Sequence, residues 1–153
     1  MVSESDTAPY FTAPMRTPDG YITEFSLSSA TDDGPVVLAF FPGAFTSVCT
    51  GEMRTFRDRL DNLTDAGASL YGVSIDSPFS LGEFAEQNEL TFPLISDTNK
   101  EVIDAYDVVM DFADLGVTGV AKRSVFVVDE SGTITYAWVS DDPGVEPDYD
   151  EVE

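Results

Sequence analysis

Apolar and polar positions alternate along the chain with two different periods, which predict strands and helices in turn. Residues 21–27 alternate between polar and apolar side chains, as expected of a strand with one face in water. Residues 35–41 are apolar at every position and therefore predict a strand that is covered on both faces. A second buried strand is predicted at residues 69–75.

Helical spacing follows each of these buried strands. Five apolar residues recur at steps of 4, 3, 4 and 3, which places them on one face of a helix that we expect to end at Gly67. They are Cys49, Met53, Phe56, Leu60 and Leu63. A second helix is predicted from Ser77 as its N-cap, through Pro78 at the first helical position, to about Asn88.

The rest of the chain predicts a short strand, a short helix and a hairpin. Residues 91–96 lead into a helix over residues 100–106. Strands are predicted at 124–129 and 133–139, and the turn residues Glu130-Ser131-Gly132 between them predict a β-hairpin. The order strand-helix-strand-helix followed by a hairpin is that of the thioredoxin-like fold, an α/β architecture with a mixed central β-sheet and helices on both faces.

No linker divides these elements, so we expect a single domain over residues 1–153, with an acidic tail from about residue 141. The tail stops where another helix could begin, and we expect a terminal helix that is truncated or frayed. Residues 1–14 have no signal-peptide pattern, and no segment reaches the ~20 apolar residues of a membrane span. A cytoplasmic protein is therefore expected.

The net charge of the chain indicates which partners and which environment to expect. The chain has 29 Asp and Glu against 7 Lys and Arg, which gives a formal net charge of −22. Such a charge repels nucleic acid and anionic membranes, so we expect neither partner. Because 42% of the residues are apolar, we interpret the acidity as the adaptation of a folded protein to high salt rather than as disorder. An acidic interaction protein is the other interpretation.

The numbers of histidine and cysteine residues exclude several kinds of catalytic and metal site: the chain has no histidine and one cysteine. It therefore has no Ser-His-Asp or Cys-His couple, no dithiol motif and no cysteine-cluster metal site. The composition leaves open a metal bound only by carboxylates, but their abundance alone does not make a site, and we expect no metal and no cofactor. Cys49 lies at a predicted helix start, where unpaired N–H groups and the helix dipole can lower a thiol pKa from about 8.5 to about 3.5–7.5. A lone cysteine can also be merely a small buried apolar residue.

The residues around Cys49 resemble a known signature. The segment Pro42-x-x-x-Thr46-x-x-Cys49-Thr50-Gly51-Glu52 reproduces and extends the Pro-x-x-x-Thr-x-x-Cys motif of peroxiredoxins. Residues 92–97 and 123–129 also match segments of that family in the order that the family uses. The resemblance covers most of the chain, which looks like a member of the AhpC/TSA superfamily of thiol peroxidases.

Within this superfamily the chain is most similar to the alkyl hydroperoxide reductase E type, with Ala44 and Phe45 inside the loop. In the related Q-type, or bacterioferritin-comigratory, proteins a second cysteine often lies five residues after the first, but here that position is Arg54. The resemblance therefore implies a one-cysteine cycle. The reductant would be an external thiol: thioredoxin, a glutaredoxin-like or mycoredoxin-like protein, or a small thiol.

The resemblance also implies roles for individual residues. Cys49 would attack a hydroperoxide, either hydrogen peroxide or an organic one, and become a sulfenic acid. Charge that develops on the peroxide oxygens requires donors, which backbone N–H groups, the Thr46 hydroxyl and the Arg123 guanidinium could supply. Pro42 would cover the thiolate with an apolar wall, and Glu52 would orient an arginine.

Each supporting residue has a second interpretation. Thr46 could be only a helix N-cap, Glu52 could only complement the helix dipole, and Arg123 could be a surface charge at the start of a strand. For the whole chain, the other hypothesis is a non-catalytic thioredoxin-fold module, such as a peroxide sensor that passes its oxidation to a partner.

Two further expectations concern the surface. Three arginines of the first long helix are expected to form ion pairs rather than to bind substrate: Arg54, Arg57 and Arg59. The resemblance also implies a homodimer formed around the active-site loop, with Phe45 near the interface.

Overall fold

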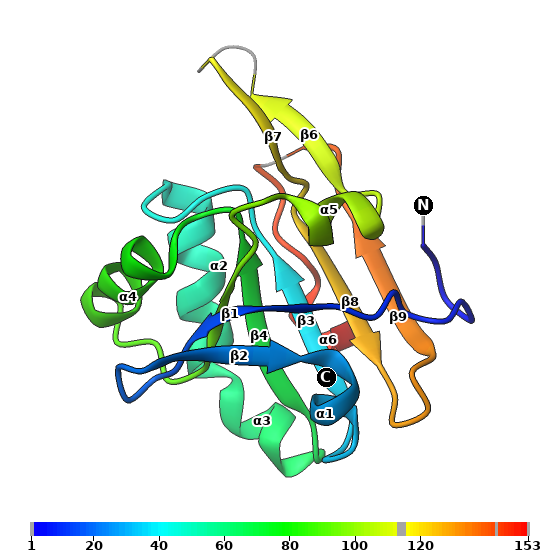
Figure 1. Ribbon diagram of the computed structural model, residues 1–153. Coiled ribbons are helices and arrows are strands. Elements are labelled where there is room, and N and C mark those ends of the chain that lie inside the picture. The colour runs from blue at the N-terminus through cyan, green and yellow to red at the C-terminus, as the bar shows by residue number, and fades with distance from the viewer. Residues whose placement is uncertain (1, 113–115, 143, 153) are drawn as a thin grey trace.

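A mixed β-sheet forms the centre of the computed structural model, which describes residues 2–112, 116–142 and 144–152 (Figure 1). In these described ranges the sheet has seven strands in the order β2-β1-β5-β4-β3-β8-β9. β3 pairs in parallel with β4, and β4 with β5, whereas the other neighbours are antiparallel. The strands are β1 (Thr12–Arg16), β2 (Ile22–Ser26), β3 (Val36–Phe40), β4 (Ser69–Ser74), β5 (Leu94–Ser96), β8 (Ser124–Val128) and β9 (Ile134–Val139).

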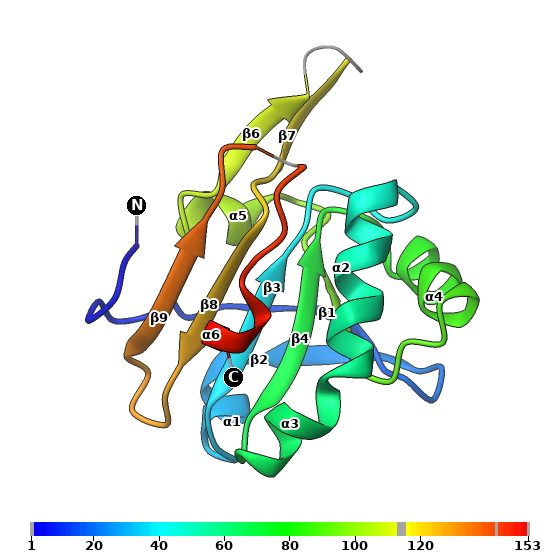
Figure 2. The ribbon, with the colours of Figure 1, turned by 180° about the vertical axis from the view of Figure 1, so that it is seen from behind.

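Helices cover both faces of this sheet (Figures 1 and 2). α1 and α5 pack on one face, and α2, α3, α4 and α6 on the other. The helices are α1 (Leu27–Thr31), α2 (Ser47–Asp58), α3 (Leu60–Asp65), α4 (Pro78–Gln87), α5 (Glu101–Ala105) and α6 (Tyr149–Val152). Within the described part of the chain, no helix is long and apolar enough to cross a membrane.

The central strand β3 has a hydrophobic core on each side. All of its residues are buried. Val36, Leu38 and Phe40 contribute to the core beneath α1 and α5. Val37 and Ala39 contribute to the opposite core, beneath α2. Side chains alternate between the faces of a strand, so a continuously apolar sequence is what two cores require, and the prediction for residues 35–41 is confirmed.

Several other local predictions are confirmed with small changes of boundary. β4 occupies most of the predicted strand 69–75, and β8 and β9 form the predicted hairpin. Ser77 is the N-cap of α4, its hydroxyl accepts a hydrogen bond from the N–H of Ser80, and Pro78 occupies the first helical position. The strand predicted over residues 91–96 is confined to β5, and α5 lies within the predicted helix at 100–106.

The helix predicted from Cys49 to Gly67 is two helices in the structure. α2 ends at Asp58 and α3 begins at Leu60, because the backbone of Arg59, at φ −102° and ψ 5°, leaves the helical region. The apolar spacing continues through this break, so the spacing alone did not reveal it. Gly67, at φ +82°, terminates the second helix in the left-handed conformation that glycine adopts most readily, as predicted.

Four other elements were not predicted. β1 contains Pro14 and is held between β2 and β5. β6 (Val109–Phe112) and β7 (Val117–Ala121) form a separate hairpin that projects beyond the sheet (Figure 1). α1 is shorter than two helical turns. These elements have weak local patterns, and packing decides their conformation. The tail that we expected to carry a truncated or frayed helix contains α6.

Candidate active site

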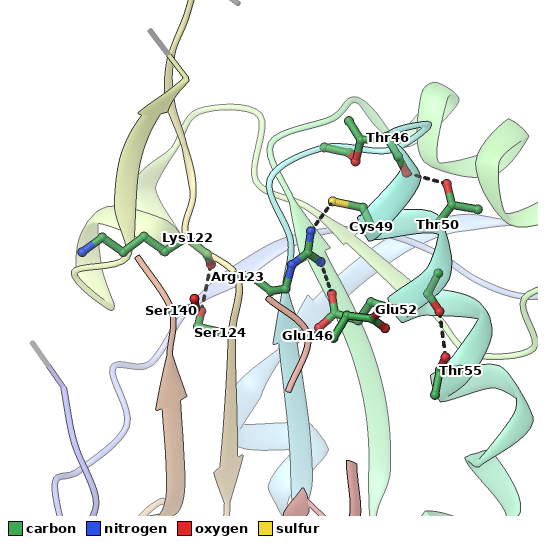
Figure 3. Close-up of polar contacts among 12 residues, drawn as sticks. Thr46, Cys49, Thr50, Glu52, Thr55, Lys122, Arg123, Ser124, Ser140 and Glu146 are labelled. Carbon is green, nitrogen blue, oxygen red and sulfur yellow. Dashed lines mark hydrogen bonds and ion pairs between the residues drawn. The ribbon is translucent and has the colours of Figure 1, made fainter. Parts of the chain in front are cut away.

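Cys49 lies in the first turn of α2, just after the loop that leaves the carboxyl end of β3 (Figure 3). The apolar face of α2 turns the side chain inward, together with Met53 and Phe56, so that Cys49 is only 1% exposed. This placement is the one predicted from the helical spacing. It puts the sulfur near the N-terminal end of the helix, where backbone N–H groups and the dipole favour an anion.

Arg123 reaches the sulfur from the neighbouring strand. β8 runs antiparallel to β3 with Ser124 opposite Phe40, so Arg123 lies beside the start of the Cys49 loop. Its Nη2 atom donates a hydrogen bond of 3.0 Å to Cys49 Sγ (Figure 3). The Arg123 side chain is buried, which excludes the interpretation as a surface charge.

Glu52 binds the other terminal nitrogen of the Arg123 guanidinium. It follows Cys49 by three positions on α2, so both side chains lie on the same face of the helix. Arg123 Nη1 donates to Glu52 Oε1 over 2.6 Å, and both side chains are almost fully buried. The orienting contact expected of Glu52 is therefore present.

Burial dominates the electrostatics of this group. It raises the pKa of Glu52 from 4.5 to about 8, although Arg123 acts in the opposite direction. Glu146 of the C-terminal segment, which lies beside Glu52 in Figure 3, raises this pKa further. Burial also acts against the positive charge of Arg123, but Glu52 and Cys49 outweigh it, and the pKa of Arg123 rises.

One buried cation thus faces two acidic groups. A buried charge requires a partner of opposite sign, and a single guanidinium neutralises only one anion. Glu52 Oε2 has no hydrogen-bond partner in the part of the chain that the structure describes, and it is the oxygen free to carry a proton. A protonated Glu52 still accepts the hydrogen bond from Arg123 but does not neutralise the positive charge of the guanidinium, which also contacts Cys49 Sγ.

The raised pKa of Glu52 predicts a pH-dependent stability. Because the folded-state pKa of about 8 lies above the unfolded value of 4.5, the unfolded chain ionises first, and stability is lost as the pH rises between these values. We expect Glu52→Gln to lose less of its free energy of unfolding over this range than the wild type. Denaturant unfolding at a series of pH values measures the difference, with the exposed Glu130→Gln as control. A pH-independent difference would contradict the prediction.

Thr46 and Pro42 lie on the loop that precedes Cys49. Thr46 is the N-cap residue of α2 by position, but its side chain does not cap the helix. Its hydroxyl donates to the Gly43 carbonyl over 2.9 Å, within the loop. Pro42 is buried at the beginning of the same loop. The structure therefore brings Cys49, Arg123 and Glu52 into direct contact and leaves Thr46 and Pro42 around them.

Two of the three arginines expected to form ion pairs, Arg57 and Arg59, contact neighbouring residues and segments. Arg57 pairs with Asp58 at 2.9 Å and donates to the Asn88 carbonyl. Arg59 lies over the ring of Tyr149, 5.5 Å from its centroid. These contacts join α2 to neighbouring segments, in agreement with a structural role for the two residues.

The sequence analysis missed Asp76, which contacts the Cys49 loop. Its Oδ2 atom accepts a 2.8 Å hydrogen bond from the N–H of Ala44. The available signal was its position, because residues that follow parallel neighbours such as β3 and β4 meet at the same edge of a sheet. Among the described residues, no group of three or more histidine, cysteine or carboxylate side chains is placed to hold a metal ion.

Comparison with known proteins agrees with this geometry. Residues 5–137 match the model of the AhpC/TSA family. The chain belongs to this family. The resemblance to peroxiredoxins that the sequence predicted is thereby confirmed, and the protein is a thiol peroxidase with a single cysteine.

Relatives of this peroxiredoxin support the same conclusion. A Mycobacterium tuberculosis protein that carries a peroxiredoxin name is 40% identical, over 89% of this chain and 84% of its own length. The alkyl hydroperoxide reductase E of that organism is 38% identical, over 67% of this chain and 65% of its own. Peroxidoxin BcpB of Mycobacterium tuberculosis superposes with a TM-score of 0.81 at 32% identity, covering 93% of this chain and 88% of its own. The predicted thioredoxin-like fold is confirmed.

Proposed function

We propose that this peroxiredoxin reduces hydroperoxides, both hydrogen peroxide and organic hydroperoxides, in a one-cysteine cycle with Cys49 as the nucleophile. The observation that carries the proposal is the 3.0 Å hydrogen bond from Arg123 to Sγ of Cys49, which is the one cysteine in the sequence. The thiolate attacks one peroxide oxygen and the O–O bond breaks. The electron pair leaves with the alkoxide or hydroxide, which takes up a proton from water, and the sulfur becomes a sulfenic acid.

The surrounding groups supply what this step requires. Arg123 and the backbone N–H groups at the start of α2 stabilise the negative charge that moves from sulfur onto the leaving oxygen. The Thr46 hydroxyl lies on the same loop and can turn from the Gly43 carbonyl toward a bound peroxide. Pro42, buried at the start of this loop, presents no N–H to the substrate, and Glu52 keeps the guanidinium in place.

Recycling requires a reductant from outside the chain. The sulfenic acid condenses with one external thiol, which releases water and leaves a mixed disulfide, and a second thiol releases reduced Cys49. Thioredoxin, a glutaredoxin-like or mycoredoxin-like protein, and a small thiol all fit this requirement. A protein recycled in this way works in a reducing compartment, which supports a cytoplasmic location.

Steady-state peroxide consumption with each reductant in turn, in molar salt, tests the proposal. We expect turnover to continue until the peroxide or the reductant is exhausted. A peroxide sensor would instead stop after one equivalent of peroxide for each protein or partner molecule. Consumption limited to one equivalent with every reductant would contradict the catalytic cycle.

We infer that two copies of the chain associate around the active-site loop. Phe45, on this loop, is 52% exposed, and Phe79, in the first turn of α4, is 78% exposed. Exposed aromatic rings of this kind are enriched where partners dock. Sedimentation in high salt should therefore give a dimer at tens of micromolar. A monomer at that concentration would rule out the association.

The net charge of −22 supports adaptation to high salt and makes stability depend on ionic strength. Repulsion between charges acts over about 30 Å at 0.01 M salt but only about 3 Å at 1 M. We expect the melting temperature to rise across this range by roughly 4–8 °C. In a domain of this size, such a rise corresponds to an increase of about 2 kcal/mol in the free energy of unfolding. Circular dichroism in sodium and potassium chloride measures it. A melting temperature independent of salt would contradict the adaptation.

A further inference from the structure

The loop before Cys49 contains a residue in an unfavourable conformation. Phe45 has a φ of +68°, in the left-handed region that residues with a Cβ atom rarely adopt. Such a conformation persists only when surrounding contacts hold it. The Phe45 side chain is half exposed, and its ring lies edge-on to that of Phe84 with centroids 5.4 Å apart. Further contacts to the loop backbone are therefore needed to hold this turn.

Asp76 provides such a contact immediately before the turn. Its Oδ2 atom accepts the N–H of Ala44 over 2.8 Å. The same oxygen accepts the hydroxyl of Ser74 over 2.7 Å, and the Ser74 oxygen in turn accepts the N–H of Asp76 over 3.2 Å. Ser74 is fully buried at the end of β4, so the carboxylate that holds Ala44 is itself fixed to the sheet.

The backbone of Asp76 is held from the other side as well. The buried Ser96 hydroxyl, at the end of β5, donates to the Asp76 carbonyl over 2.6 Å. Ser77, the next residue, caps α4. Asp76 thus joins the edge of the parallel strands to the Cys49 loop, which is the rigid support that a catalytic loop requires.

We propose that Asp76 is a positioning residue for peroxide reduction, because it holds the loop from Pro42 to Thr46 in the conformation that receives the peroxide. This inference rests on the proposed role of Cys49. Asp76 acts through the N–H of Ala44 and not on the sulfur, whose hydrogen bond comes from Arg123. Its loss should therefore disturb the reaction with peroxide more than the thiolate itself.

Two rates measured on each variant test the proposal: oxidation of Cys49 by peroxide in a single turnover, and alkylation of Cys49 by iodoacetamide. Asp76→Ala should slow oxidation by roughly tenfold to a hundredfold, the cost of a misplaced reacting group, and leave alkylation unchanged. Asp76→Asn should recover most of the oxidation rate, because its carbonyl oxygen can still accept the N–H of Ala44. Thr98→Ala is the matched control, since Thr98 contacts Ser96 in the same network but not the loop.

Three outcomes would overturn the proposal: a wild-type oxidation rate in Asp76→Ala, equal losses of oxidation and alkylation, or no rescue by asparagine. If Asp76→Ala fails to fold by circular dichroism, Ser74→Ala decides, because it removes the hydrogen bond that fixes the Asp76 carboxylate to the sheet and so loosens the contact of Asp76 with Ala44. A severalfold loss of oxidation with unchanged alkylation supports the proposal, and an unchanged oxidation rate overturns it. Failure of the proposed function would be distinct, because wild-type Cys49 would then be alkylated but not oxidised.

Discussion

Cys49→Ser is expected to lower peroxide turnover by roughly 10⁴-fold or more and to leave the fold intact. A serine hydroxyl is not appreciably ionised at neutral pH and is a poor nucleophile toward peroxide. Serine is close in size to cysteine and can accept the hydrogen bond from Arg123, so the buried contact is kept. The effect should therefore be confined to the reaction.

Steady-state peroxide consumption with an excess of reductant measures this loss, and circular dichroism verifies the fold. The chain has one cysteine, so no other thiol can account for residual activity. Wild-type turnover by Cys49→Ser would mean that the proposed mechanism is wrong.

The second large effect is expected for Arg123→Ala, which should slow oxidation of Cys49 by roughly 10² to 10³, the usual cost of removing one donor to a developing charge. The substitution also removes the partner of Glu52 from a site that is almost fully buried. Glu52 can respond by staying protonated, in line with its raised pKa. Single-turnover formation of the sulfenic acid, followed by mass spectrometry, separates the chemical step from recycling.

Arg123→Lys and Arg57→Ala provide the matched variants. Lysine keeps a positive charge but cannot donate in the planar, two-armed geometry by which Arg123 contacts Cys49 and Glu52 together, so its rate should stay well below the wild type. Arg57 is on the same helix as Cys49 but binds Asp58 and Asn88, and its loss should leave the rate near the wild type. A wild-type rate in Arg123→Ala would remove the guanidinium from the mechanism.

Local patterns predicted the elements that hold the site. β3 and β4 were predicted correctly because their apolar residues must fill a core on each face of the sheet. The start of α4 was predicted correctly because Ser77 and Pro78 satisfy the helix terminus within a few residues. β1 was missed because pairing with β5, which is distant in sequence, helps to decide its conformation, and the β6–β7 hairpin was missed because its local pattern is weak. Arg16 of β1, for example, lies opposite Leu94 of β5.

The sequence by itself determined the spacing of Pro42, Thr46, Cys49 and Glu52, since helical geometry and a short loop relate these positions locally. Only the tertiary structure decided which charges meet there. Arg123 lies 74 residues after Cys49, and pairing of β8 with β3 brings the two into contact. The raised pKa of Glu52 likewise depends on burial, and the hydrogen bond between Asp76 and Ala44 depends on strand order. Desolvation and non-local hydrogen bonds arise only when the whole sheet and its helices assemble.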